Sequence, residues 1–229
     1  MTNTSPADRP AAALSDTLDV DIWSDLVCPW CYLGRARFEL ALAAFDHRTA
    51  VRVTNRAFEL DPAAPRDTTT TVAEMLAAHY GGQADTLRAG EQRLVELTAE
   101  IGLGYQVDRL HGNTFDAHRL VQLGLDRGVA DGLVERLYRA NFAEGRSIFE
   151  PASLTEIAVE AGLDRDEARA VVEGTAYGDR VRADEQLAAQ LGISGVPFFV
   201  LDHAYGISGA QATEMFSSVL DQVWQERHA

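Results

Sequence analysis

The chain of 229 residues contains no lysine, so its 20 basic residues are all arginine, and they stand against 35 acidic residues. The resulting formal net charge of −15 predicts an acidic surface, which repels nucleic acid and anionic membranes. The sequence also lacks any apolar run near the roughly 20 residues that a membrane-spanning helix needs. We therefore expect neither a nucleic-acid partner nor a membrane partner.

Cysteine is scarce, with two residues in the chain, and the amino terminus shows no basic start followed by an apolar stretch. We interpret residues 1–16 as a disordered polar tail and expect a cytoplasmic protein. In a reducing cytosol, a close cysteine pair is usually catalytic or metal-binding rather than a structural disulfide. The six histidines show no ligand-like spacing, so we expect no metal site.

The hydrophobic pattern divides the chain into a part with strands and a part with helices alone. Strand alternation and helical spacing place six elements in the first part, namely strands over 18–24, 51–58, 196–201 and 204–208 and helices over 32–45 and 211–225. We assign residues 17–67 and 188–229 to this domain and residues 68–187 to a helical insertion domain. The expected order is β–α–β, helical insert, β–β–α.

The insertion shows several signals of helices. Three capping boxes mark helix starts, at Thr71 with Glu74, Ser153 with Glu156 and Asp164 with Glu167. Amphipathic runs lie near 84–101, 114–127, 131–143 and 179–191. We expect these helices to bury their apolar faces against one another and against a four-stranded sheet, with no second sheet in the span.

The two cysteines stand in the segment Cys28-Pro29-Trp30-Cys31, at the first strand-to-helix turn. Free N–H groups and the helix dipole favour a thiolate at Cys28, and Pro29 suits the first helical turn. Cys31 lies one turn further on, so it can resolve a mixed disulfide formed by Cys28. Two inert buried thiols are the alternative, but a strand before the pair and a helix after it favour a redox motif.

A second feature, Pro197, opens the strand that follows the insertion. A proline at this point is commonly only a feature of a strand edge. In a thioredoxin fold, however, a cis-proline loop lies against the two-cysteine motif. We therefore predict a cis bond before Pro197 and the Val196 backbone within a few ångström of the Cys28 sulfur, where it can pair with an extended substrate.

These arguments give a first set of site residues. We expect Trp30 to be exposed and able to stack on a peptide or an aromatic molecule, whereas Trp23 is expected in the core. The predicted catalytic residues are Cys28, Cys31 and Pro197, and the predicted substrate contacts are Trp30, Val196 and Pro29.

Four segments resemble DsbA-like proteins of the FrnE subfamily, and they span most of the chain. They are Ser24-Asp25-Leu26-Val27-Cys28-Pro29-Trp30-Cys31-Tyr32-Leu33-Gly34, the stretch 113–120, the stretch 192–199 and Ser208-Gly209-Ala210-Gln211. The resemblance implies an α/β thioredoxin fold interrupted by an α-helical insertion domain. It also implies a cytosolic thiol–disulfide oxidoreductase of the protein disulfide oxidase or isomerase type.

More distant relatives of this fold are the 2-hydroxychromene-2-carboxylate isomerases and the kappa-class glutathione transferases. The resemblance implies that these families place serine at the position of Cys28 and a Ser-Asp pair near Ala210-Gln211 to hold glutathione. This chain departs from both features, which favours redox chemistry. A glutathione-dependent isomerase or transferase acting on an aromatic metabolite is the alternative function, and a chaperone-like binder using a groove beside Pro197 is a third.

Two polar residues are further candidates. The resemblance to thioredoxin and DsbA implies a buried acid six residues before the nucleophile, but that position is Ile22. Asp25 is the nearest carboxylate and a candidate proton acceptor for Cys31, with a solvated turn residue as the alternative. His118 is a candidate to face the active site from an insertion helix, with a surface or capping histidine as the alternative.

The predicted chemistry needs no cofactor other than the redox-active Cys28–Cys31 disulfide itself, which a low-molecular-weight thiol could recycle. The expected partner is a protein or small molecule that carries a thiol or a disulfide. The sequence leaves open the direction of the reaction and the assembly state, for which a homodimer is one alternative.

Overall fold

The computed structural model describes residues 17–80 and 84–228 and has a four-stranded mixed sheet at its centre. The strands are β1 (Leu18–Ser24), β2 (Val51–Ala57), β5 (Phe198–Leu201) and β6 (Tyr205–Ser208), in the order β2-β1-β5-β6. Strand β1 runs parallel to β2 and antiparallel to β5, which pairs antiparallel with β6. This is the expected thioredoxin fold. The predicted tail, residues 1–16, lies outside the described residues.

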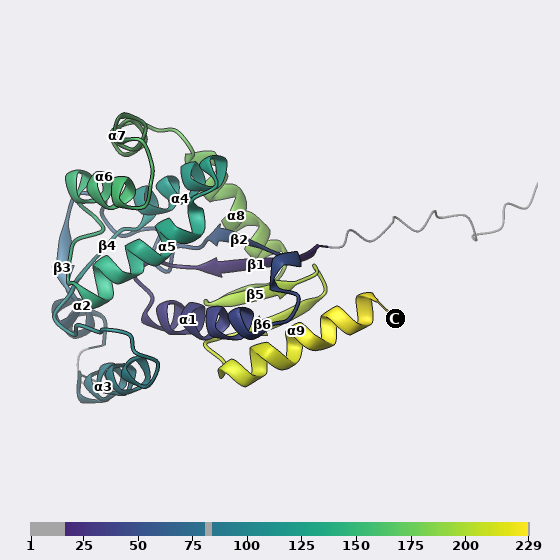
Figure 1. Ribbon diagram of the computed structural model, residues 1–229. Helices are drawn as coiled ribbons and strands as arrows, with labels where there is room; N and C mark the ends of the chain where they lie inside the picture. Colours follow the sequence, from purple (N-terminus) through teal and green to yellow (C-terminus); the bar gives the residue numbers. More distant parts are fainter. Residues whose placement is uncertain (1–16, 81–83, 229) are drawn as a thin grey trace, which may run out of the picture.

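The two faces of the sheet are covered by different helices. Helices α1 (Pro29–Ala44) and α9 (Thr213–Arg227) lie side by side on one face (Figure 1), where Phe38 and Phe216 pack on Phe199. Helix α8 (Gly178–Gln190) lies against the other face. There the Trp23 indole N–H donates to the Asp184 carbonyl at 3.1 Å. Trp23 is buried in the core, as expected.

The other helices build the second half of the molecule. They are α2 (Val72–Tyr80), α3 (Ala84–Glu100), α4 (Phe115–Arg127), α5 (Ala130–Tyr138), a π-helical turn (Arg139–Ala143), α6 (Pro151–Glu160) and α7 (Arg165–Glu173), and a 3-10 turn (Arg48–Ala50) precedes β2. Helices α4 to α7 enclose a second apolar cluster, which also contains Cys28 and Cys31. The domain boundaries stay a prediction, and the one at 187/188 falls within α8. Within the described part of the chain, every helix is too short or too polar to cross a membrane.

Two helix starts in the insertion are as predicted. The Glu74 backbone N–H donates to the Thr71 hydroxyl at 3.1 Å, and the Thr71 N–H donates back to the Glu74 carboxylate at 2.8 Å. The Asp164 carboxylate accepts the N–H groups of Asp166 at 2.9 Å and Glu167 at 3.0 Å. Each start satisfies backbone donors that the helix itself leaves free.

Two expectations for the insertion are wrong. A second sheet does exist, because β3 (Thr69–Thr71) pairs antiparallel with β4 (Leu110–Gly112), and strands of three residues are too short to show alternation. Helix α6 does not begin at a Ser153 capping box. It begins at Pro151, which needs no N–H partner there, and the Ser153 hydroxyl donates to the Ser147 carbonyl at 2.6 Å.

Candidate active site

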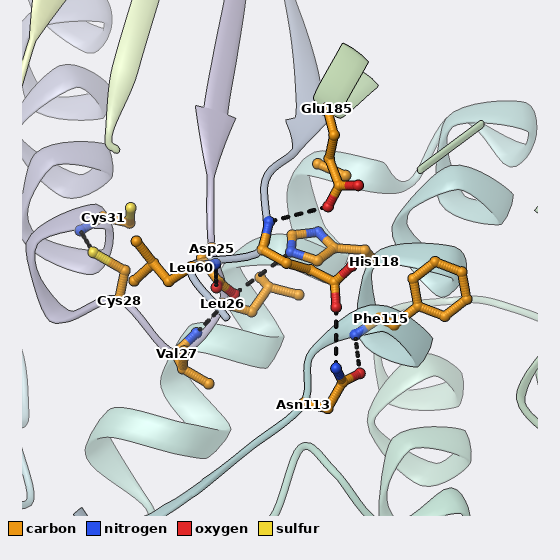
Figure 2. Close-up of polar contacts among 12 residues, drawn as sticks. Asp25, Leu26, Val27, Cys28, Cys31, Leu60, Asn113, Phe115, His118 and Glu185 are labelled. Atoms are coloured by element: carbon orange, nitrogen blue, oxygen red, sulfur yellow. Dashed lines mark hydrogen bonds and ion pairs between the residues drawn. The ribbon is translucent and has the colours of Figure 1, made fainter. Parts of the chain in front are cut away.

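The two thiols lie where β1 passes into α1. Cys28 is the residue that caps α1, and its sulfur accepts the Cys31 backbone N–H at 3.4 Å (Figure 2). Pro29 occupies the first helical turn, as expected. Both cysteines are free thiols, and Cys28 is 4% exposed against 1% for Cys31. The positive end of the helix dipole therefore acts on Cys28, the more accessible of the two sulfurs.

The Pro197 loop lies directly against this motif. The Val196–Pro197 bond is cis, and the Cys28 thiol donates to the Val196 carbonyl oxygen at 3.8 Å, so both geometric predictions are confirmed. The close approach depends on Gly34, because a Cβ there would lie 2.9 Å from Cγ of Pro197 and 3.2 Å from Cα of Ala210. Glycine on α1 thus lets the loop reach the thiol pair.

Aromatic side chains flank the motif on two sides. Trp30 is 43% exposed, as expected for a residue that contacts substrate, although that role stays a prediction. Tyr32 points inward, and its ring stacks on Phe142 of the π-helical turn with ring centroids 4.9 Å apart. The Tyr138 hydroxyl donates to the Asp25 carbonyl at 3.2 Å, and the Asn141 amide donates to the Leu26 carbonyl at 3.4 Å. The insertion therefore holds the loop that precedes Cys28.

Asp25 is buried, with 1% exposure, so the alternative of a solvated turn residue is wrong. Its carboxylate accepts the Leu60 N–H at 2.7 Å and the Val27 N–H at 3.4 Å (Figure 2). Burial raises the pKa of Asp25, but His118, the Leu60 N–H and Thr114 together outweigh burial and hold this pKa below its ordinary value. The carboxylate is therefore ionised at neutral pH.

His118 projects from α4 toward the same carboxylate. It is 3% exposed, so the surface alternative is wrong, and its Nε2 lies 3.5 Å from Oδ1 of Asp25. The distance is that of an ion pair when the imidazole carries a proton, and Nε2 has no hydrogen bond of normal geometry within the described residues. The structure thus brings Asp25 and His118 together behind the thiol pair, whereas their roles stay predictions.

The sequence interpretation missed Glu59, which is 5% exposed and follows β2. Its carboxylate accepts the Asn113 amide at 3.2 Å and pairs with Arg182, and its backbone N–H donates to Glu185 at 3.3 Å. Burial, with the charge of Glu185, raises the pKa of Glu59 above its ordinary value, although Arg182 and His118 act to lower it. The residues next to Glu59 in the sequence do not indicate these partners. Arg182 and Glu185 lie on α8, and Asn113 lies in the loop before α4.

The thiol of Cys31 is poorly suited to ionise by itself. Burial raises the pKa of Cys31 well above its usual value, and Cys28 and the Asp25 carboxylate raise it further, whereas the Asp25 backbone N–H lowers it.

Within residues 17–80 and 84–228, no group of three or more His, Cys, Asp and Glu side chains could hold a metal ion.

Comparisons with known proteins agree with this fold. The model of the DSBA-like thioredoxin domain matches residues 19–221. A probable DsbA oxidoreductase from Streptomyces coelicolor has a TM-score of 0.87 and 53% identity, with 91% of each chain covered. The uncharacterized protein YwbO of Bacillus subtilis is 26% identical over 205 residues, which are 89% of this chain and 96% of YwbO.

A more distant likeness concerns the fold alone. The cytosolic disulfide reductase DsbM from Pseudomonas aeruginosa, solved with GSH, has a TM-score of 0.65 and 18% identity, and the match covers 90% of this chain and 99% of DsbM. The match to the family model, at residues 19–221, begins in β1 and ends in α9. It therefore includes the sheet, the insertion and both cysteines. The chain therefore belongs to the DSBA-like thioredoxin domain family of oxidoreductases.

Proposed function

We propose that this protein is a cytosolic thiol–disulfide oxidoreductase that works through Cys28 and Cys31. The observation that carries the proposal is the position of the Cys28 sulfur, which caps α1, accepts the Cys31 N–H at 3.4 Å and lies 3.8 Å from the Val196 carbonyl. A sulfur at a helix N-terminus is stabilised as a thiolate, the form that attacks disulfides. The Val196 carbonyl beside it offers a partner for an N–H of an extended substrate.

The reaction conserves atoms and electrons in two steps. The Cys28 thiolate attacks one sulfur of a substrate disulfide, and the other substrate sulfur leaves as a thiolate and takes a proton. Cys31 then loses its proton and attacks the Cys28 sulfur, which forms the Cys28–Cys31 disulfide and releases the second substrate thiol. Two protein thiols are oxidised and one substrate disulfide is reduced, and the reverse sequence oxidises a substrate dithiol.

The substrate proposed is a disulfide or dithiol in a protein, with Trp30, Pro29 and Val196 as its contacts beside the thiols. The exposure of Trp30 supports this assignment, because an aromatic ring beside the nucleophile can stack on a peptide. A low-molecular-weight thiol is proposed to recycle Cys28–Cys31, and the relative that was solved with GSH is a cytosolic disulfide reductase. A solved 2-hydroxychromene-2-carboxylate isomerase has a similar fold at 17% identity, but cysteine at position 28 favours redox exchange over the alternative of a glutathione-dependent isomerase.

The test is a pair of cysteine variants incubated with a peptide that contains one disulfide. Cys28→Ser is expected to abolish exchange, whereas Cys31→Ser is expected to trap a mixed disulfide between Cys28 and the peptide. The reason is that only Cys28 occupies the helix N-terminus. Intact-mass spectrometry under denaturing acid detects the trapped adduct.

The double variant Cys28→Ser/Cys31→Ser is the matched control and should form no adduct. Exchange that persists in Cys28→Ser, or an adduct found on Cys31 in preference to Cys28, would contradict the proposed roles. Isomerisation of an aromatic metabolite that depends on glutathione and survives in the double variant would favour the alternative function instead.

A further inference from the structure

Arg37, on α1, is a cation without an acidic partner in an acidic chain. The chain has 35 acidic residues against 20 basic ones, so most arginine side chains have a carboxylate nearby. Among the arginines whose side chains the structure describes, all form an ion pair except Arg37 and Arg48. Arg37 is partly buried, whereas Arg48 is exposed in the 3-10 turn before β2. A partly buried cation without a carboxylate needs another explanation.

One hydrogen bond fixes the place of the Arg37 guanidinium. Its Nη1 donates to the Ala210 carbonyl at 2.9 Å, and Ala210 belongs to the segment between β6 and α9. This segment lies against the Pro197 loop, because the Gly209 N–H donates to the Pro197 carbonyl at 2.8 Å. A Cβ at Gly34 would lie 2.9 Å from Cγ of Pro197 and 3.2 Å from Cα of Ala210, so α1 contacts both segments at this residue. Arg37 is thus held beside the Pro197 loop.

Arg37 also shares a face of α1 with Trp30. Residues three and four apart are neighbours on a helix surface, so Trp30, Gly34 and Arg37 form one stripe. Trp30 is 43% exposed at one end of the stripe, and the Pro197 loop packs on Gly34 in its middle. Helical side chains lean toward the helix N-terminus, which is the end that carries Cys28. A substrate that contacts Trp30 and the Pro197 loop can therefore extend toward the guanidinium.

The guanidinium has donors left for a ligand. Arginine carries five N–H groups, and within the described residues Arg37 uses one of its nitrogens, in the bond to Ala210. The acid closest to it in the sequence, Glu39, pairs with Arg35 instead. The remaining donors suit a carboxylate, which arginine binds through two parallel hydrogen bonds.

We propose that Arg37 is a specificity-determining residue that binds an aspartate or glutamate side chain of a protein substrate. The proposal rests on the proposed function, because it concerns which disulfides Cys28 attacks. From Cys28 to Arg37 the helix rises about 13 Å, and an extended chain covers about 3.3 Å per residue. Since both side chains add to the reach, the acidic residue is expected about three residues from the cysteine under attack.

The charge of the whole chain makes this contact selective. A formal net charge of −15 disfavours acidic substrates in general and favours basic ones. A cation at one place beside the thiols reverses this preference at that place alone. The expected substrate is therefore neutral or basic overall and carries an acidic residue at one position.

A purely structural role for Arg37 predicts a different result. If the guanidinium only holds residues 209–211 through the Ala210 carbonyl, its loss should slow exchange equally for every substrate. A carboxylate site predicts instead that the loss depends on the charge of the substrate at one position. Reversal of the charge at position 37 should then reverse the preference.

The experiment measures exchange between the reduced protein and an excess of blocked peptides, each dimerised through one cysteine. The peptides carry glutamate, glutamine or lysine, either three residues before the cysteine or three residues after it. Chromatography after acid quenching follows the released peptide thiol and gives a second-order rate constant. At one of the two positions, the wild type should exchange the glutamate peptide about threefold to tenfold faster than the lysine peptide. At the other position, the lysine peptide should be equal or faster.

Three variants of Arg37 separate charge from structure. Arg37→Glu should reverse the order of the glutamate and lysine peptides, and Arg37→Gln should abolish the difference between them. Arg37→Lys keeps the charge and should retain the preference for glutamate. Arg48→Glu is the matched control, because it makes the same change of charge at the other arginine that lacks an ion pair in the described part of the chain. It should keep the wild-type order.

The outcomes separate this proposal from the proposed function. The wild-type order of peptides in Arg37→Glu, or no preference for glutamate at either position in the wild type, overturns the role of Arg37, although exchange itself would still support the proposed function. If Arg37→Glu fails to fold by circular dichroism, the other two variants decide. Loss of the preference in Arg37→Gln with retention in Arg37→Lys then supports the proposal, and any other result overturns it. Absence of exchange with every peptide overturns the proposed function, and the Arg37 proposal falls with it.

Discussion

The two larger apolar clusters of the described residues differ in their relation to the redox motif. The cluster between the sheet and helices α1 and α9 contains Ile22, Phe38 and Phe216 but neither cysteine. The cluster inside the insertion contains Cys28 and Cys31 together with the helices α4 to α7. The sheet therefore fixes where the motif begins, whereas the insertion provides the surroundings of the sulfurs. We infer that exchange depends more on packing in the insertion than on packing in the sheet core.

The largest effect is expected for a matched pair of truncations, Phe142→Ala in the insertion and Phe216→Ala in the sheet core. Both side chains are fully buried, so each variant should lose about 3–5 kcal/mol of unfolding free energy. Only Phe142 stacks on Tyr32, next to Cys31, so only Phe142→Ala should also change the exchange rate of the protein that remains folded. Urea titration and exchange assays measure the two quantities, and equal exchange rates in both variants would contradict the comparison.

A smaller effect is expected for a pair of glycines. Gly34→Ala places a methyl group 2.9 Å from the Pro197 ring and 3.2 Å from the Ala210 backbone, so it should cost about 1–3 kcal/mol and slow exchange. Gly132→Ala on α5 meets no atom within 4 Å and should stabilise the protein by about 1 kcal/mol with exchange unchanged. Thermal unfolding and exchange rates test the pair. If Gly34→Ala were as stable and as active as Gly132→Ala, the close approach of the Pro197 loop to α1 would be shown to limit neither stability nor exchange.

The smallest effect concerns acid stability and is confined to low pH. The pKa of Asp25 in the folded state lies below its ordinary value of 3.8, so the unfolded state binds more protons between the two values. The unfolding free energy of the wild type should therefore fall as the pH drops through this range, and it should fall less steeply in Asp25→Asn. Urea titrations from pH 5 to 2.5 measure the slopes. Parallel curves for the two proteins would show that Asp25 is not held in its ionised form by folding.

Local patterns in the sequence could predict the sheet and the thiol pair because the relevant signals are short-range. Alternation places β1 and β2, and two cysteines between a strand and a helix place Cys28 at a helix N-terminus. The Asp164 cap is visible in the same way, since its partners are two and three residues away.

The rest of the site depends on contacts between distant segments. His118 contacts Asp25 from α4, and Arg182 contacts Glu59 from α8, so the residues next to Asp25 and Glu59 in the sequence do not reveal either contact. The strands β3 and β4 were not predicted because each has three residues and, among the described residues, they form a sheet of two strands. The Ser153 prediction failed because the helix begins at Pro151, three residues before Leu154, the first helical residue that the capping-box pattern indicates.

The central claim is that Cys28 and Cys31 form a reversible redox couple, and the reduction potential of that couple tests it most directly. Trp30 brings no charge to the motif and the buried Asp25 carboxylate opposes a nearby thiolate, whereas the helix N-terminus favours one. We therefore predict a potential between about −270 and about −120 mV, the values of thioredoxin and DsbA. Equilibration in glutathione buffers, followed by alkylation and mass spectrometry, measures the oxidised fraction. A disulfide that fails to form at any ratio of glutathione to its disulfide would contradict the account, whereas a midpoint within this range would support it.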